Sequence, residues 1–310
     1  MKKWMLKAII QGFLSIFPQS EKWNFLFQKY VTRKAILPTS RVQRRIDWCA
    51  KHIEYYQTYS PNDWPPTSVL ELGTGWFPTV PICLYLCGVD QIYTVDIYRL
   101  INPDTLRQTL NIFRQIIQEH KLGEVLPVFS QERTQDVVRL AGTYDKQPIP
   151  ETLANLHIEY LICDARNLPL TDSSIGFIVS NTTLEHIASE IIQGIFQEFY
   201  RVASPNALMS HLIDISDHYS HFDSSITPLN YLKYSSKQWR FFNTPLQYQN
   251  RLRISQYRKL HTYAKFEIVS EMNNFVSPET LANINVADLF KDFTEDDLLG
   301  TQTWMLAQKT

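Results

Sequence analysis

Short apolar runs that end at turn residues recur along the chain and alternate with stretches of helical periodicity. Such runs predict strands, and the stretches between them predict helices on the faces of a mostly parallel sheet. Residues 79–87 predict a first helix that Gly88 stops, and Asn102 with Pro103 opens the next. The pattern predicts an α/β fold of seven strands, which are residues 69–72, 91–96, 157–163, 175–180, 207–213, 266–270 and 303–307.

Two segments have the period of an amphipathic helix. After Asn102, apolar residues recur every three or four positions and predict a core-facing stripe of Leu106, Leu110, Phe113 and Ile117. Residues 4–17 are apolar except for a narrow polar stripe of Lys7, Gln11 and Ser15. We expect this N-terminal helix to pack on the α/β domain. The alternative is a peripheral contact of residues 1–30 with a membrane surface.

Composition and charge narrow the class of protein. With 310 residues and 44% hydrophobic content, the chain can bury a sizeable core. Residues 1–45 hold ten Lys or Arg and one acid, so they carry about +9 and the remainder about −10. These cations lie on an apolar helix and the total charge is near zero, which argues against a nucleic-acid ligand.

Cysteine usage and the N-terminus indicate the compartment. No stretch approaches the ~20 apolar residues that span a bilayer, and no small-residue cleavage site follows the N-terminal run. The cysteines lack the spacing of a metal site, so we expect them to be core residues of a protein in a reducing compartment. They are Cys49, Cys83, Cys87 and Cys163. We therefore expect a cytoplasmic protein without a metal site.

Residues 69–75, Val-Leu-Glu-Leu-Gly-Thr-Gly, carry the clearest chemical signal. A strand breaks into a turn at Gly73 and Gly75, where a backbone without Cβ atoms lets a cofactor approach the following helix. A dinucleotide fingerprint would have a third glycine where this chain has Pro78. Glu71, two residues before the first glycine, indicates a ligand that carries an amino group.

A second acid supports a nucleoside site. The predicted strand at 91–96 ends in Asp96, 23 positions after Gly73. A carboxylate at this strand tip is placed to accept hydrogen bonds from both ribose hydroxyls.

The middle of the chain resembles a known family. Residues 164–187 run Asp-Ala-Arg-Asn-Leu-Pro-Leu through to Leu-Glu-His-Ile, and residues 200–208 read Tyr-Arg-Val-Ala-Ser-Pro-Asn-Ala-Leu. Together with the glycine turn, these motifs are similar to those of class I S-adenosylmethionine-dependent methyltransferases of the small-molecule, type 11 kind. The resemblance covers about residues 65–213 and 264–309. Phe77 and Asn206 depart from it by standing where the family has glycines.

The resemblance implies an organisation for the whole chain. Residues 65–309 would form a Rossmann-like seven-stranded methyltransferase domain, and residues 1–64 a helical N-terminal cap. Compared with a minimal domain, residues 124–156 and 214–263 would be insertions. The second insertion, which follows the fifth strand and is rich in aromatic residues, would close the pocket.

The resemblance also assigns S-adenosylmethionine as cofactor and gives roles to its binding residues. Glu71 would meet the ammonium of the methionine part, and the backbone of Gly73, Thr74 and Gly75 would approach that part and the ribose. Asn181 would lie where the sulfonium methyl points.

The adenosine half of the cofactor would contact the tips of two other strands. Asp96 would hold the ribose and Ile97 would pack on the adenine. Asp164 would accept from the adenine amino group, and the Ala165 amide would face the ring edge.

Residues after the fifth strand are candidates for the acceptor, because ligands bind at strand ends in open α/β sheets. His218 is the first candidate for a general base and His186 the second, although His186 could equally brace its helix. Arg251 beside Trp239 could grip a carboxylate or phosphate, or face solvent on a helix. The candidate substrate-binding residues are His211, Asp214, Tyr219, Trp239 and Arg251.

Together, the motifs and the family resemblance predict methyl transfer to an oxygen, in preference to a nitrogen, of a small organic or peptidic acceptor. Two alternatives stay open: a non-catalytic S-adenosylmethionine-binding protein, and a nucleic-acid methyltransferase. Asn181-Thr182-Thr183 differs from the Asn-Pro-Pro-aromatic motif of enzymes that methylate nucleic-acid bases, which weakens the nucleic-acid alternative.

Overall fold

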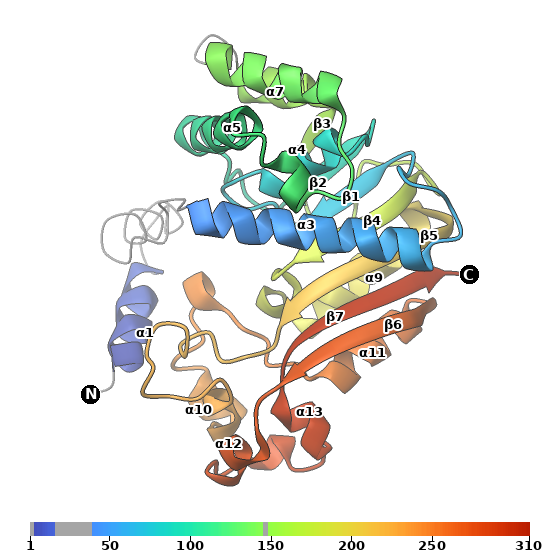
Figure 1. The fold of residues 1–310 in the computed structure, drawn as a ribbon. Helices are drawn as coiled ribbons and strands as arrows, with labels where there is room; N and C mark the ends of the chain where they lie inside the picture. Colours follow the sequence, from blue (N-terminus) through green and yellow to red (C-terminus); the bar gives the residue numbers. More distant parts are fainter. Residues whose placement is uncertain (1–2, 16–38, 145–147) are drawn as a thin grey trace.

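A single seven-stranded sheet organises the protein. The computed structural model describes residues 3–15, 39–144 and 148–310. The strand order is β3-β2-β1-β4-β5-β7-β6 (Figure 1). Strands β1 to β5 are parallel, and β7 is antiparallel to its neighbours β5 and β6. The strands are β1 (Val69–Leu72), β2 (Ile92–Asp96), β3 (Ile158–Ile162), β4 (Ile175–Asn181), β5 (Ala203–Asp214), β6 (Phe266–Phe275) and β7 (Gly300–Lys309).

Helices cover both faces of the sheet, so the core forms two layers (Figure 1). Helices α3 (Thr39–Tyr59), α4 (Thr79–Leu86), α5 (Pro103–Gln118) and α7 (Gln131–Thr143) pack on one face. Helices α9 (Ser189–Val202) and α11 (Ile254–Tyr263) pack on the other. Side chains alternate between the faces as a pleated strand requires: Val69 belongs to the first layer and Leu70 to the second.

The predicted α/β fold of seven strands is confirmed, but the last three strands along the chain are longer than predicted. β5, β6 and β7 each extend beyond the predicted ranges. Asn102 closes a capping box on α5, with Pro103 at the first helical position. In the predicted stripe of α5 the first three residues are buried, but Ile116 rather than Ile117 takes the fourth buried place.

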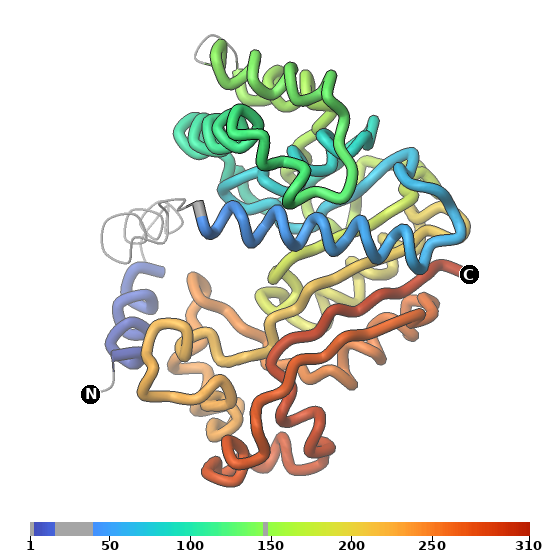
Figure 2. Tube along the Cα trace, viewed as in Figure 1, coloured from blue at the N-terminus to red at the C-terminus, as the bar shows by residue number. Residues whose placement is uncertain are grey.

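A third cluster lies outside the sheet. It joins α1 (Lys3–Leu14) to aromatic residues that follow β5, and Figure 2 shows these segments side by side. The remaining helices are α6 (Leu122–Val125), α8 (Ile149–Ala154), η2 (Leu184–His186), η3 (Asn230–Lys233), α10 (Ser236–Trp239), η4 (Pro245–Gln247), α12 (Pro278–Ala282), η5 (Asp288–Phe290) and α13 (Glu295–Leu299).

Helix α1 turns its polar stripe toward the protein. Lys7 and Gln11 are buried, and the Lys7 ammonium lies 5.8 Å from the ring centre of Tyr219. Leu6 and Ile9 are 48% and 57% exposed. Within the described residues, no helix has the length and apolarity to cross a bilayer. Residues 16–30 of the segment that could contact a membrane surface lie outside the described residues.

Candidate functional site

The glycine turn lies at the carboxyl end of β1, in the middle of the sheet. Chain order reverses here, because β2 follows on one side of β1 and β4 lies on the other, and ligands bind at such a switch point. Gly73 and Gly75 have φ of 82° and 71°, values that favour glycine. A Cβ at Gly73 would collide with the side chain of Thr183. At Gly73 the absent Cβ lets Thr183 pack against the turn, whereas no atom of the described residues lies within 4 Å of where a Cβ of Gly75 would be.

Two acids flank this turn, and the pKa of each is raised. Glu71 is 3% exposed and accepts a hydrogen bond from the Thr94 hydroxyl at 3.0 Å. Asp96 accepts one from the Gly75 amide at 3.1 Å and one from the Tyr160 hydroxyl at 3.3 Å. Burial, and next the nearby Glu71 carboxylate, raise the pKa of Asp96 from 3.8 to about 8. Burial also raises the pKa of Glu71. This site is suited to a ligand with a positive charge and a diol.

Arg45 on α3 is a polar wall of the same site that the sequence did not indicate. It lines a small cavity with Glu71, Gly73, Thr74 and Asn181, among others. Its guanidinium donates to the Phe77 carbonyl at 2.9 Å. Burial lowers the pKa of Arg45, with Glu71 acting in the opposite direction. An acid and a guanidinium in one cavity match a zwitterionic group such as the methionine part of a cofactor.

Asn181 ends β4 and is fixed by a histidine from α3. His52 is fully buried, and its ring nitrogens contact the Ser210 hydroxyl at 2.7 Å and the Asn181 amide oxygen at 3.1 Å. Burial lowers the pKa of His52 to about 3, so the ring is neutral and donates through Nε2 while Nδ1 accepts. The buried Asn181 Nδ2 finds no hydrogen-bond partner among the described residues. This amide therefore presents unused donors at the cavity.

The other residues expected near an adenosine lie at the tips of neighbouring strands. Asp96 of β2 pairs with Ile162 of β3, so Ile97 and Asp164 follow on adjacent strands. Ile97 is 59% exposed, which leaves an apolar surface open. The Asp164 carboxylate accepts from the Arg166 guanidinium and amide at 2.9–3.0 Å, while Ala165 is buried.

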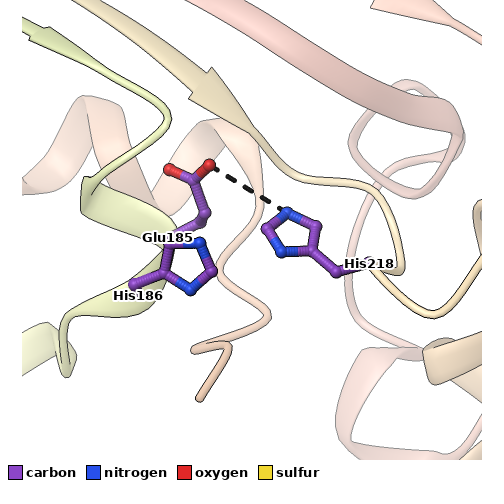
Figure 3. Close-up of side chains that lie close together, drawn as sticks. All are labelled: Glu185, His186 and His218. Carbon is purple, nitrogen blue, oxygen red and sulfur yellow. Dashed lines mark ion pairs between the residues drawn. The ribbon is translucent and has the colours of Figure 1, made fainter. Parts of the chain in front are cut away.

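A second polar cluster forms where β4 and β5 end. Glu185 and His186 belong to η2, directly after β4, and His218 follows β5. Figure 3 shows the three side chains facing one another, with Glu185 Oε1 and His218 Nε2 4.0 Å apart. Glu185 is 1% exposed, whereas the His186 side chain is exposed. The cluster thus has a buried acid and an open side.

Asp214 adds a second carboxylate to this cluster. Its Oδ2 lies 3.4 Å from His218 Nε2, and it accepts from the Ser216 amide and hydroxyl. Although burial alone would raise the pKa of Asp214, His218 and Ser216 hold it down at about 2. Among the described residues, this is a strongly polar region next to Asn181 at the same edge of the sheet.

Part of the chain matches a known family. The model of a methyltransferase domain family, type 11, matches residues 127–210, which include the Leu-Pro-Leu to Leu-Glu-His motif. This match supports the predicted class I, type 11-like methyltransferase, an enzyme with S-adenosylmethionine as its cofactor. No curated protein matches the sequence.

Several solved structures of methyltransferases are similar to this chain at low identity. A methyltransferase from Methanosarcina mazei has 16% identity and a TM-score of 0.43, covering 82% of this chain and 95% of that one. A putative methyltransferase from Bacillus halodurans has 15% identity and a TM-score of 0.43, covering 84% and 99%. Geranyl diphosphate C-methyltransferase from Streptomyces coelicolor has 11% identity and a TM-score of 0.45, covering 84% and 79%.

The residues at the glycine turn fit S-adenosylmethionine. Three features are complementary to a sulfonium nucleoside with an ammonium group: the glycine backbone at 73 and 75, the unused amide donors of Asn181, and the buried Glu71 with the half-buried Asp96. Arg45 supplies the guanidinium that the carboxylate of the same group would need.

Some residues expected to bind the substrate are held in the protein core instead. His211 is fully buried on the α9 side of the sheet, where it stacks on Phe196, and its Nδ1 contacts the Ser180 hydroxyl at 2.8 Å. The side chains of a strand alternate, so Ser210 and not His211 faces α3 and His52. We therefore leave His211 out of the acceptor site.

Three further candidates stabilise the insertion after β5. The Tyr219 hydroxyl donates to the Phe242 carbonyl at 2.7 Å, and Trp239 is 3% exposed. The Arg251 guanidinium lies over the Trp239 ring and donates to the carbonyls of Tyr231 and Tyr234. These donors serve the backbone, so a gripping role for Arg251 does not enter our proposal.

Proposed function

We propose that the chain transfers a methyl group from S-adenosylmethionine to an oxygen of a small organic or peptidic acceptor. When bound, S-adenosylmethionine supplies an electrophilic methyl group on sulfur. Glu71 and Arg45 would hold the ammonium and carboxylate of its methionine part, and Asp96 its ribose hydroxyls. The buried Glu71 and the half-buried Asp96 on either side of the glycine turn carry this proposal. Accurate placement of the acceptor oxygen then supplies much of the rate, because well-oriented groups contribute ~7–11 kcal/mol.

The state of Asn181 favours an oxygen over a nitrogen acceptor. Its amide oxygen accepts from His52, which leaves only N–H donors for a ligand. An acceptor oxygen can take such a hydrogen bond with one lone pair and attack with another. A neutral amine has a single lone pair, which the attack consumes. The donor therefore positions an alcohol, phenol or carboxylate.

The acceptor would extend from Asn181 toward the cluster of Glu185, His186 and His218. A carboxylate acceptor needs no base, but an alcohol or phenol must lose a proton. His218, close to Asp214, and His186 are placed to assist that loss. The insertion that carries His218 is anchored in the third hydrophobic cluster, which supports its predicted role of excluding water.

Calorimetric titration of S-adenosylhomocysteine tests the cofactor site, and turnover of S-adenosylmethionine with a panel of phenols, hydroxy acids, carboxylic acids and amines tests the acceptor class. We expect micromolar binding that is lost in Gly73→Arg, and product formation with oxygen acceptors. Asn181→Asp replaces the donor by an acceptor and should reduce turnover about tenfold or more while S-adenosylhomocysteine still binds. Absence of binding by the folded wild type would refute the proposal, and binding without turnover of any acceptor would favour the non-catalytic alternative.

A further inference from the structure

The cluster of Glu185, His186 and His218 has the composition of a metal site. One ligand atom from each residue lies within 4.8 Å of the other two. Tetrahedral bonds of 2.0–2.1 Å would place such atoms about 3.4 Å apart, so side-chain adjustments of about 1 Å would close the set. Two imidazoles and one carboxylate suit divalent ions such as Zn²⁺ or Fe²⁺ rather than Mg²⁺ or Ca²⁺, which prefer oxygen ligands.

Unused polar atoms point toward a missing ligand. Neither carboxylate oxygen of the buried Glu185 has a hydrogen-bond partner among residues 3–15, 39–144 and 148–310. His218 Nε2 likewise forms no hydrogen bond within those ranges and faces two carboxylates, Glu185 at 4.0 Å and Asp214 at 3.4 Å. Buried polar groups in proteins normally have hydrogen-bond partners, so these atoms are exceptions. A cation between these groups would satisfy them.

Three neighbouring residues of the insertion contact Glu185, His186 and His218. His186 Nδ1 is 2.7 Å from the Tyr248 carbonyl and donates to it, which leaves Nε2 with a free lone pair. The Gln249 side chain accepts from the His218 amide at 3.3 Å. Asn250 donates its amide to the Glu185 carbonyl at 2.9 Å. Residues 248 to 250 thus orient the His186 ring and hold the backbone at His218 and Glu185.

We propose that Glu185, His186 and His218 bind a divalent first-row transition-metal ion of the Zn²⁺ class beside the methyl acceptor. The binding site stands on the geometry alone, whereas the role of the ion rests on the proposed function. A cation there lowers the pKa of a neighbouring hydroxyl, and it would replace the two imidazoles in this role, because a metal-bound imidazole nitrogen cannot accept a proton. The acceptor O–H bond breaks and its proton passes to water on the open side of His186. The oxygen keeps the electron pair that forms the O–CH₃ bond, while the S–CH₃ electrons stay with sulfur.

Metal titration of the untagged, full-length chain after dialysis against a chelator tests the site directly. We expect stoichiometric uptake of Zn²⁺, and visible absorption from Co²⁺ typical of mixed nitrogen and oxygen ligands. Glu185→Gln preserves shape and His186→Ala changes an exposed side chain, so both variants should fold. Each should weaken binding about 100-fold or more, whereas His120→Ala, a histidine after α5, should leave it unchanged.

The outcomes separate this proposal from the proposed function. If the folded wild type takes up neither ion, or if uptake survives in Glu185→Gln and His186→Ala, the metal site is refuted. Calorimetry with S-adenosylhomocysteine on the same samples reports the cofactor site separately. Intact cofactor binding without metal would leave methyl transfer standing, and metal binding without cofactor binding would refute methyl transfer alone.

Discussion

Replacing Asp96 by Asn should weaken cofactor binding and stabilise the free protein at the same time. The half-buried carboxylate accepts hydrogen bonds only from the Gly75 amide and the Tyr160 hydroxyl among the described residues, and its pKa rises from 3.8 to about 8. For an acid with a raised folded-state pKa, the stabilising contribution is complete below pH 3.8 and is lost as pH rises to about 8. At 1.36 kcal/mol per pKa unit, the loss at pH 7 is at most about 4 kcal/mol. An uncharged Asn avoids this loss of stability.

The same substitution removes the acceptor of the proposed ribose site, a carboxyl that would be ionised in the complex. Hydrogen bonds to a charged group contribute about 1.5–3 kcal/mol and neutral ones about 1 kcal/mol, and Asn keeps only one of the two acceptor oxygens. A loss of about 2–3 kcal/mol in binding corresponds to a 30- to 150-fold weaker Kd for S-adenosylhomocysteine. At pH 8 we expect the free energy of unfolding to rise by about 2 kcal/mol, after some loss for the unpaired amide.

Urea denaturation from pH 5 to 9 and calorimetry with S-adenosylhomocysteine measure the two effects. Asp63→Asn, an exposed acid in the loop before β1, is the matched control and should change neither. A variant that binds S-adenosylhomocysteine within threefold of wild type would refute the ribose role of Asp96. Lower stability of Asp96→Asn at pH 8 would refute the electrostatic reasoning.

Further predictions concern the same edge of the sheet and its supporting helices. Because Asp96 is largely protonated in the free protein at pH 7, S-adenosylhomocysteine binding should release protons, seen as different calorimetric enthalpies in phosphate and Tris and absent in Asp96→Asn. Arg45→Met should weaken that binding about tenfold or more, while Arg44→Met on the exposed side of α3 should not. His52→Phe should lower turnover with little change in the Kd for S-adenosylhomocysteine, because it frees the Asn181 amide; an equal loss of both would contradict a positioning role. Asn102→Ala should cost about 1 kcal/mol of stability by urea denaturation, and no change would show that its capping box contributes nothing.

The fold could be predicted because its signals are local. The strand, glycine turn and helix at residues 69–86 each have their own periodicity or breaker, and Asn102 with Pro103 marks a helix start by chemistry alone. Burial of the polar stripe of α1 was not predictable in this way. Lys7 is buried because the aromatic rings of Tyr219 and Phe222 lie against it, and they come from residues more than two hundred positions away.

The acceptor side was harder to predict, since its residues meet only through tertiary packing. Glu71 and Asp96 lie near each other because β1 and β2 pair in parallel, with Glu71 opposite Thr94. The sequence allowed this prediction, because both acids stand in recognisable strands. His211 was expected in the site, but strand alternation turns its neighbour Ser210 toward α3, a signal that the sequence did contain. No spacing rule reveals that Arg251 is bound by backbone carbonyls.

Helix α3 contributes side chains to the proposed site, which the sequence of the N-terminal region did not indicate. Arg45, Trp48 and His52 are separated by three and four residues, so they form one stripe of the helix. Arg45 and Trp48 line the cofactor cavity, while His52 orients Asn181 through its amide oxygen. The opposite face of α3 is exposed at Arg44 and Asp47. A segment expected to act as a cap therefore contributes a wall of the proposed site. Cofactor binding and acceptor alignment should both depend on how firmly α3 packs on the sheet, because one helix face supplies groups to each.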